Sequence, residues 1–334
     1  MMITKKMKTI VALLMSTVLV LSITACGSSK TTTTNDDSKE SGDTYTIGIA
    51  QLVQHEALDA ATKGFKDALK EKLGDKVKFD EQNAQGDPAT CATIVNGFVS
   101  AKVDLILANA TAPLQAAAAG TTTIPILGTS ITDYATALDI DDWKGTTGMN
   151  ISGTSDLAPL KDQAALLNEL FPNAKKVGML YCSAEANSQY QVDVMTELLK
   201  PYGYEVENYS FVDSNDIASV ATNAVSSCDV LYVPTDNTAA SNTEIINNIC
   251  KPAGIPVIAG EEGICKGCGV ATLSISYYDL GYTTGQMAYE VLVNGKDVST
   301  MEVQFAPKVT KKYNKTNCEA LNITVPDGFE AIAE

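Results

Sequence analysis

The chain has 334 residues and a net charge of −16, with 40 acidic residues against 24 basic ones and a single histidine. Every basic residue is a lysine, so no guanidinium fork is available to bind a carboxylate or phosphate through two parallel hydrogen bonds. A surface this acidic repels nucleic acid and anionic lipid headgroups, which excludes a nucleic-acid-binding protein.

Residues 1–25 have the pattern of an export signal. Lys5, Lys6 and Lys8 precede an apolar stretch too short to span a bilayer, and small residues lead up to Cys26. This arrangement resembles a bacterial lipobox, which implies that Cys26 becomes the lipidated first residue and anchors the protein to the outer face of the cell membrane. The alternative is an uncleaved anchor with an incidental cysteine. Both readings place the body outside the cytoplasm.

A polar stretch follows the signal. Residues 27–43 contain no apolar side chain and cannot bury enough surface to offset their ordering entropy. We therefore expect residues 26–43 to be a flexible tether and the folded body to start at Thr44. The body is long enough for one large or two medium domains.

Short apolar runs alternate with stretches of helical periodicity along the body, and consecutive apolar positions are typical of strands buried on both faces. Such alternation indicates parallel sheets flanked by helices. The runs are Tyr45–Gln51, 103–109, 123–129, Lys176–Cys182, 228–235, 255–260 and 271–276.

The two halves of the body repeat one pattern. The segment 103–109 is matched by 228–234, and 124–128 is matched by 255–260. Two copies of one α/β unit predict two lobes with a cleft between them. Because ligands of parallel sheets lie beyond the carboxyl ends of the strands, we expect a ligand in this cleft and closure by a hinge.

Short polar side chains follow the predicted strands, and they suit a zwitterion. Asp236 or Glu261 could pair with an ammonium group. Thr111, Ser188 and helix N-terminal amides could hold a carboxylate, while Tyr277 or Tyr278 could face an apolar or aromatic side chain. Asn109 and Ser130 also follow or end predicted strands and are further candidates.

No catalytic constellation is visible. The nucleophile-elbow, Walker and dinucleotide glycine motifs are missing, so the lone His55 is interpreted as a residue that lines the cleft, and no cofactor or metal is expected. Cys265 and Cys268 form a CxxC pair in a Gly-rich stretch between two predicted strands. We interpret them as an incidental loop pair or a small disulfide, with a thiol oxidoreductase as the alternative.

Five motifs carry a resemblance to a known family: residues 51–65, 82–88, 183–188, 234–238 and 276–288. They resemble the substrate-binding lipoproteins of ABC importers, in the branch associated with tryptophan and other aromatic amino acids. The resemblance implies a type I periplasmic-binding-protein fold, in which two Rossmann-like lobes are joined by a three-strand hinge. It places residues 44–153 plus 276–295 in the first lobe and 154–275 plus 296–334 in the second.

The resemblance also implies that residues of these motifs lie near the ligand. Those residues are Gln51, His55, Glu56, Asn187, Ser188, Asp236, Asn237 and Tyr277. One departure is the Cys-bearing stretch 261–269, which replaces a single acidic loop and could change ligand choice.

The expected protein is a monomeric, non-enzymatic solute receptor. It would capture an aromatic or branched amino acid by hinge closure and deliver it to an ABC permease, with the lipid anchor as its only contact with the membrane. A nucleoside or sugar is the alternative ligand, and a ligand-sensing lipoprotein of the same fold is the alternative role.

Overall fold

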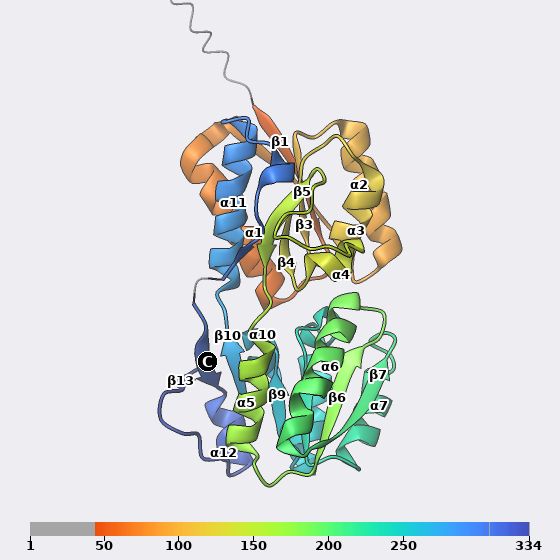
Figure 1. Cartoon of the computed structure of the whole chain (residues 1–334), viewed down its shortest axis with the longest axis vertical. Helices are drawn as coiled ribbons and strands as arrows, with labels where there is room; N and C mark the ends of the chain where they lie inside the picture. The colour runs from red at the N-terminus through yellow and green to blue at the C-terminus, as the bar shows by residue number, and fades with distance from the viewer. Residues whose placement is uncertain (1–43, 307, 334) are drawn as a thin grey trace, which may run out of the picture. The chain divides into compact units, whose positions relative to one another are not determined.

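The computed structural model describes residues 44–306 and 308–333, so the predicted export signal, Cys26 and the tether 26–43 lie outside the described residues. Two sheets are present, each with helices on both faces (Figure 1). No helix of the described part is long and apolar enough to cross a membrane.

The first sheet has six strands in the order β11-β5-β4-β3-β1-β2, and all its pairings are parallel. Its strands are β1 (Tyr45–Gln51), β2 (Val77–Asn83), β3 (Leu105–Asn109), β4 (Ile126–Ile131), β5 (Ile151–Ser155) and β11 (Gln304–Phe305). Its helices are α1 (Glu56–Leu73), α2 (Pro88–Ala101), α3 (Thr111–Gly120), α4 (Tyr134–Leu138) and α11 (Tyr277–Leu292), with short 3₁₀ turns at Gly74–Lys76 and Val298–Thr300.

The second sheet has seven strands in the order β13-β12-β10-β9-β8-β6-β7, and only the β10–β12 pairing is antiparallel. Its strands are β6 (Lys176–Cys182), β7 (Glu205–Phe211), β8 (Val230–Val233), β9 (Val257–Ala259), β10 (Ala271–Ser274), β12 (Thr310–Tyr313) and β13 (Glu330–Ala331). Its helices are α5 (Leu160–Leu170), α6 (Ala186–Leu199), α7 (Ile217–Val225), α8 (Asn237–Ala240), α9 (Thr243–Ala253), α10 (Glu262–Gly267) and α12 (Lys315–Ala320), with a 3₁₀ turn at Lys200–Tyr202.

The apolar runs form strands because helices cover both faces of each sheet. In β3, Leu105 and Leu107 pack on one side of the sheet, whereas Ile106 and Ala108 pack on the other. Successive side chains of a strand point to opposite faces, so a strand covered on both sides is apolar at every position. The prediction of two α/β lobes with parallel-dominated sheets is confirmed.

The chain passes between the two sheets three times: after β5, after β10 and after β11. After β10 it returns to the first sheet as α11, which packs closely along α1 (Figure 1). Glycines permit this approach, because a Cβ at Gly281 would lie 1.9 Å from the carbonyl oxygen of Ala61.

The segment 296–305 departs from the predicted lobe boundary. We expected it in the second lobe, but β11 pairs with β5, and Val298 and Met301 lie in a core cluster of the first sheet. A two-residue edge strand leaves no periodic signal in the sequence, which explains the difference.

Candidate ligand-binding site

Side chains from the carboxyl ends of both sheets meet around one small cavity. The cavity offers about 10 Å³ of free space, room for about one water molecule. Seven of the residues predicted from the sequence line it: His55, Ser130, Asn187, Asp236, Asn237, Glu261 and Tyr277. They come from both halves of the chain, as the repeat predicted. We call this space the inner cavity.

Asp156 is the carboxylate of the inner cavity that sequence reasoning missed. It directly follows β5, where the chain leaves the first sheet, and its side chain is buried. It accepts hydrogen bonds from Tyr277 Oη at 2.9 Å and Thr132 Oγ1 at 3.2 Å. Burial raises the pKa of Asp156 to about 6, although both hydrogen bonds favour the ionised form. Asp156 and Tyr277 thus connect two of the three passages between the sheets.

Asp236 follows β8 and is almost fully buried. Its carboxylate accepts from the backbone N–H of Cys182 at 2.7 Å, from Ser188 Oγ at 2.7 Å and from the N–H of Ala239 at 2.8 Å. Burial, reinforced by the nearby Glu185, raises the pKa of Asp236 to about 7. Ser188 is itself fully buried, lines neither of the cavities described here, and positions Asp236.

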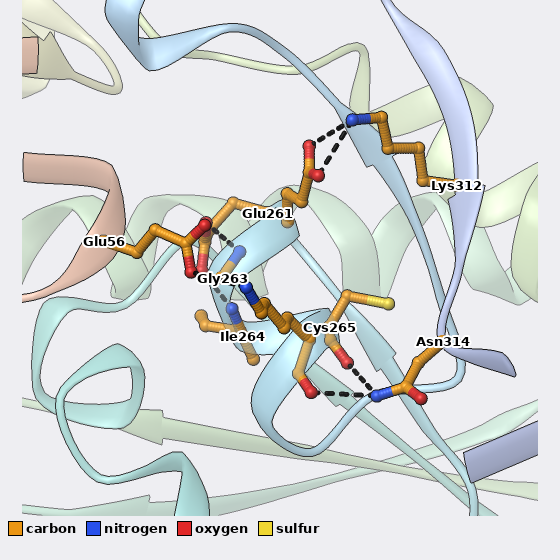
Figure 2. Close-up of polar contacts among 9 residues, drawn as sticks. Glu56, Glu261, Gly263, Ile264, Cys265, Lys312 and Asn314 are labelled. Atoms are coloured by element: carbon orange, nitrogen blue, oxygen red, sulfur yellow. Dashed lines mark hydrogen bonds and ion pairs between the residues drawn. The ribbon is translucent and has the colours of Figure 1, made fainter. Parts of the chain in front are cut away.

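Glu261 is the third buried carboxylate, and it caps α10. Figure 2 shows its carboxylate at the first turn of that helix, where it accepts from the N–H of Gly263 at 2.6 Å and from the N–H of Ile264. An acidic N-cap stabilises a helix by satisfying its free amides. Burial raises the pKa of Glu261 to about 7.

The CxxC pair belongs to this same element. The stretch that we expected to be a loop forms α10, and Cys265 and Cys268 are buried, free thiols rather than a disulfide. Burial raises both thiol pKa values well above the usual value, which keeps them protonated and unreactive. Asn314 ties down the end of the helix by donating to the carbonyls of Cys265 at 3.1 Å and Lys266 at 2.8 Å (Figure 2).

Ser130 presents an unpaired hydroxyl to the inner cavity. Its side chain is buried, and Oγ has no hydrogen-bond partner within the described part of the chain. The residue also has a φ of 57°, in the left-handed region that non-glycine residues rarely adopt. A buried, unpaired hydroxyl on a strained backbone is typical of a ligand-binding position.

A wider groove adjoins the inner cavity and encloses about 540 Å³. Asn187 and Asn237 line both spaces and form their common wall. Leu52, Val53 and Val212 give the groove an apolar part, and Thr111 lies on its first-lobe side. We call this space the outer groove.

Asn237 is held from both lobes. Its Oδ1 bonds with His55 Nε2 at 3.2 Å, and its N–H and Nδ2 donate to Glu185 at 3.0 and 2.7 Å. Glu185 also accepts from the N–H and the hydroxyl of Thr238, both at 2.8 Å. Burial lowers the pKa of His55, so the imidazole is not a cation at neutral pH.

Besides Ser188, three of the predicted residues lie away from both spaces. Gln51 and Asn109 belong to a buried network at the start of α1, where Thr62 Oγ1 donates to Gln51 Oε1 at 2.7 Å and Asn109 Nδ2 donates to Thr62 Oγ1 at 2.9 Å. Glu56 is exposed and forms an ion pair with Lys266 at 3.7 Å, which joins α1 to α10.

The sequence signal for Asp156 was weak for a definite reason. The preceding strand, β5, has the sequence ISGTS, which is not an apolar run, so no strand end was predicted before Asp156. Glu185 was visible in a polar window, but its role in holding α8 depends on contacts across 52 and 53 residues.

The fold and this site define a two-lobed solute-binding protein. A family model described as "ABC transporter substrate binding protein" matches residues 46–334. The "Tyrosine-binding protein" of Clostridioides difficile (strain R20291) is 37% identical over 324 residues, which cover 95% of this chain and 93% of that protein.

Solved structures of similar chains have the same two-lobed fold. A domain from Streptococcus pneumonia in complex with L-Trp has a TM-score of 0.82 and 32% identity, with 87% of this chain and 100% of that one covered. The ligand-free, open structure of a substrate binding protein with adhesive properties from Clostridium difficile has a TM-score of 0.66 and 38% identity, covering 86% and 99%.

This chain therefore belongs to the ABC transporter substrate-binding protein family, and its fold is that of the type I periplasmic binding proteins. It is an extracytoplasmic binding protein and not an enzyme.

Proposed function

We propose that this protein is a lipid-tethered receptor, anchored through Cys26, that binds an α-amino acid with a large aromatic side chain and delivers it to an ABC permease. One observation carries the proposal. Asp156, Asp236 and Glu261, all buried, converge on a cavity the size of one water, and no described residue lining that cavity is a lysine.

An ammonium group fits this arrangement in size and in charge. It is about as large as the water that the cavity can hold, and it donates three hydrogen bonds. Buried carboxylates without a cation are costly, which is why the pKa values of all three are raised by burial. A ligand ammonium would offset that cost. We propose Asp156 as its nearest partner, because Asp156 accepts only from two hydroxyls, whereas Asp236 and Glu261 are each held by two backbone amides.

The side chain of the amino acid would occupy the outer groove, because the inner cavity has no room for a ring. The groove volume of about 540 Å³ is within the range of pockets that bury drug-sized ligands. Its apolar residues Leu52, Val53 and Val212 suit an aromatic ring. The two relatives named for tyrosine and bound to L-Trp support this ligand class.

The carboxylate of the ligand would be held by neutral donors. The Ser130 hydroxyl is unpaired, and the first-turn amides of α3 at Thr111 border the groove. Helix N-termini bind anions through free amides and the helix dipole. These donors come from the first lobe, whereas Asp236 and Glu261 come from the second.

This division gives a physical basis for closure. A ligand that contacts carboxylates of one lobe and donors of the other stabilises the closed form by its differential affinity for it. Asp156 and Tyr277 lie on the passages that must bend, so binding at Asp156 acts directly at the hinge. In this proposal the closed form docks on the permease, and ATP hydrolysis takes place in the transporter.

The test is a thermal-shift screen of residues 42–334, which form one compact unit, against the twenty amino acids, nucleosides and sugars. A ligand at one hundred times its Kd adds about 2.7 kcal/mol of stability. We expect selective stabilisation by tyrosine, tryptophan or phenylalanine, confirmed by calorimetry. Stabilisation by sugars or nucleosides alone, or by no amino acid, would contradict the proposal.

A further inference from the structure

We propose that the site also accepts ligands that carry the ammonium group but lack the carboxylate, namely aromatic amino-acid amides and arylalkylamines. This inference rests on the proposed function, because it concerns the same inner cavity and outer groove. It extends the substrate class to molecules with a net positive charge.

The first argument is the charge of the walls. Every ionised side chain that lines the two spaces in the described part of the chain is a carboxylate. The inner cavity has three, and the outer groove adds Asp87, Glu185 and Asp213. A site of one sign raises the local concentration of ligands with the opposite net charge. A zwitterion has no net charge, so this field does not raise its local concentration. An amine or an amino-acid amide carries a net positive charge and is concentrated by the field.

The second argument is that no lysine of the described part of the chain lines either space, and the two lysines beside α10 are paired with carboxylates. Lys266, on α10, forms its ion pair with Glu56 at 3.7 Å. Lys312 donates to both oxygens of Glu262 at 2.8 and 2.7 Å, and neither lysine lines the inner cavity or the outer groove. Since the chain has no arginine, the ligand carboxylate meets no cationic side chain among the described residues that line the site.

The third argument concerns what the neutral donors can distinguish. The Ser130 hydroxyl and the amides at Thr111 can donate to a carboxylate oxygen, but they donate equally well to the carbonyl oxygen of a carboxamide. Strong selection for a carboxylate needs a charged donor, because charge-assisted hydrogen bonds are about twice as strong as neutral ones. Strong selection for the ammonium is present, because its loss leaves buried carboxylates unpaired.

The fourth argument is space. The inner cavity admits only a group of water size, so the substituents of the ammonium-bearing carbon lie at its wall with the outer groove, beside Asn187 and Asn237. The groove encloses about 540 Å³, which is large enough for an added amide. Among the described lining residues, no cationic side chain is placed to reject a ligand for lacking a negative charge there.

Isothermal titration calorimetry of residues 42–334 at neutral pH tests the inference with two matched series. The probes are L-tyrosine, L-tyrosinamide, tyramine, N-acetyl-L-tyrosine and 3-(4-hydroxyphenyl)propionate, together with the corresponding tryptophan compounds. We expect the amides and amines to bind within about tenfold of the parent amino acid, and the two ammonium-free compounds to bind more than about 100-fold more weakly.

The outcomes separate this inference from the proposed function. If tyrosine or tryptophan binds but its amide and amine are more than about tenfold weaker, the inference is wrong and the proposed function stands. If the amides and amines bind and no amino acid does, the inference stands and the proposed amino-acid ligand is wrong. If none of these probes binds, both are wrong.

A charge-insertion variant tests the electrostatic cause. Ser241→Lys places a cation on the exposed rim of the outer groove, whereas Ser226→Lys adds the same charge at an exposed position that lines neither space. We expect Ser241→Lys to shift the ratio of acid to amide affinity about two- to fivefold toward the acid, with no shift in Ser226→Lys. An unchanged ratio in Ser241→Lys would contradict the charge argument.

Discussion

Each lobe has a buried serine near its strand-end polar residues, but the two serines have different partners. In the second lobe, Ser188 Oγ donates its single proton to Asp236 at 2.7 Å, so it cannot also donate to a ligand. In the first lobe, Ser130 Oγ is buried without a partner and faces the inner cavity. A repeated α/β unit therefore fixes where polar residues gather, while the contacts around each residue decide whether it is part of the scaffold or free for a ligand.

The carboxylates differ in the same way. Asp236 and Glu261 of the second lobe each accept from at least two backbone amides and cap α8 and α10. Asp156, between the lobes, accepts only from the hydroxyls of Thr132 and Tyr277. The second-lobe carboxylates are needed for local structure even without a ligand, whereas Asp156 has the geometry of a ligand partner.

The largest effect is expected from Asp156→Asn, which removes this charge and keeps the shape. The ammonium loses its main ion pair, so the Kd for the aromatic amino acid should rise by about 30- to 1,000-fold, equivalent to about 2–4 kcal/mol. Calorimetry measures the loss. Asp162→Asn, at an exposed position of α5, is the matched control. An Asp156→Asn protein that folds and binds within threefold of wild type (about 0.7 kcal/mol) would overturn the role given to Asp156.

Next in size is the response to pH. Burial raises the pKa values of Asp156 to about 6 and of Asp236 and Glu261 to about 7, so the folded, ligand-free protein binds more protons than the unfolded chain. The contribution of these three carboxyl groups to stability is fully present below the ordinary carboxyl pKa of about 4 and is lost as the pH rises through the folded values of about 6 to 7.

The ligand should respond in the opposite direction. An ammonium favours the ionised carboxylates, so binding releases protons and the Kd should rise as the pH falls below about 7, by up to about tenfold per pH unit for each proton displaced. Titrations in two buffers of different ionisation enthalpy measure the proton release. Affinity that stays constant from pH 5 to 8 would show that these carboxylates do not contact the ligand.

Ser188→Ala sharpens the contrast between the two serines through stability. It leaves a buried carboxylate with one donor fewer, so we expect a loss of about 1–3 kcal/mol in the free energy of unfolding. Urea unfolding without ligand provides the measurement. A variant as stable as wild type would mean that the Ser188–Asp236 hydrogen bond is dispensable.

Ser130→Ala should give the smallest effect, and on binding rather than stability. The unpaired hydroxyl contributes no internal hydrogen bond, so unfolding should change by less than about 0.5 kcal/mol. The Kd for the amino acid should rise about two- to tenfold, as for loss of one neutral hydrogen bond. Each serine variant is the control for the other, and the reverse pattern would contradict the division of roles drawn here.

Much of the fold was predictable because its strongest signals are local. The runs at Tyr45–Gln51 and Lys176–Cys182 form strands with the predicted bounds, since burial on both faces requires apolar residues throughout. The edge strands β2 and β7 were not predicted, because a half-exposed edge strand mixes charged and apolar residues as VKFDEQN and EVENYSF do.

The repeated α/β unit predicted two lobes with a cleft, and the five motifs carried the resemblance to the family. The predicted strand-end windows supplied seven residues of the inner cavity. Tertiary structure alone decided which polar side chains satisfy one another and which remain free. Gln51 and Asn109 look like Asn187 and Asn237 in the sequence, but they are enclosed by Thr62 and α1. Hydrogen-bond satisfaction depends on neighbours distant in the chain, and so does the burial that leaves Asp156 a carboxylate without a cation.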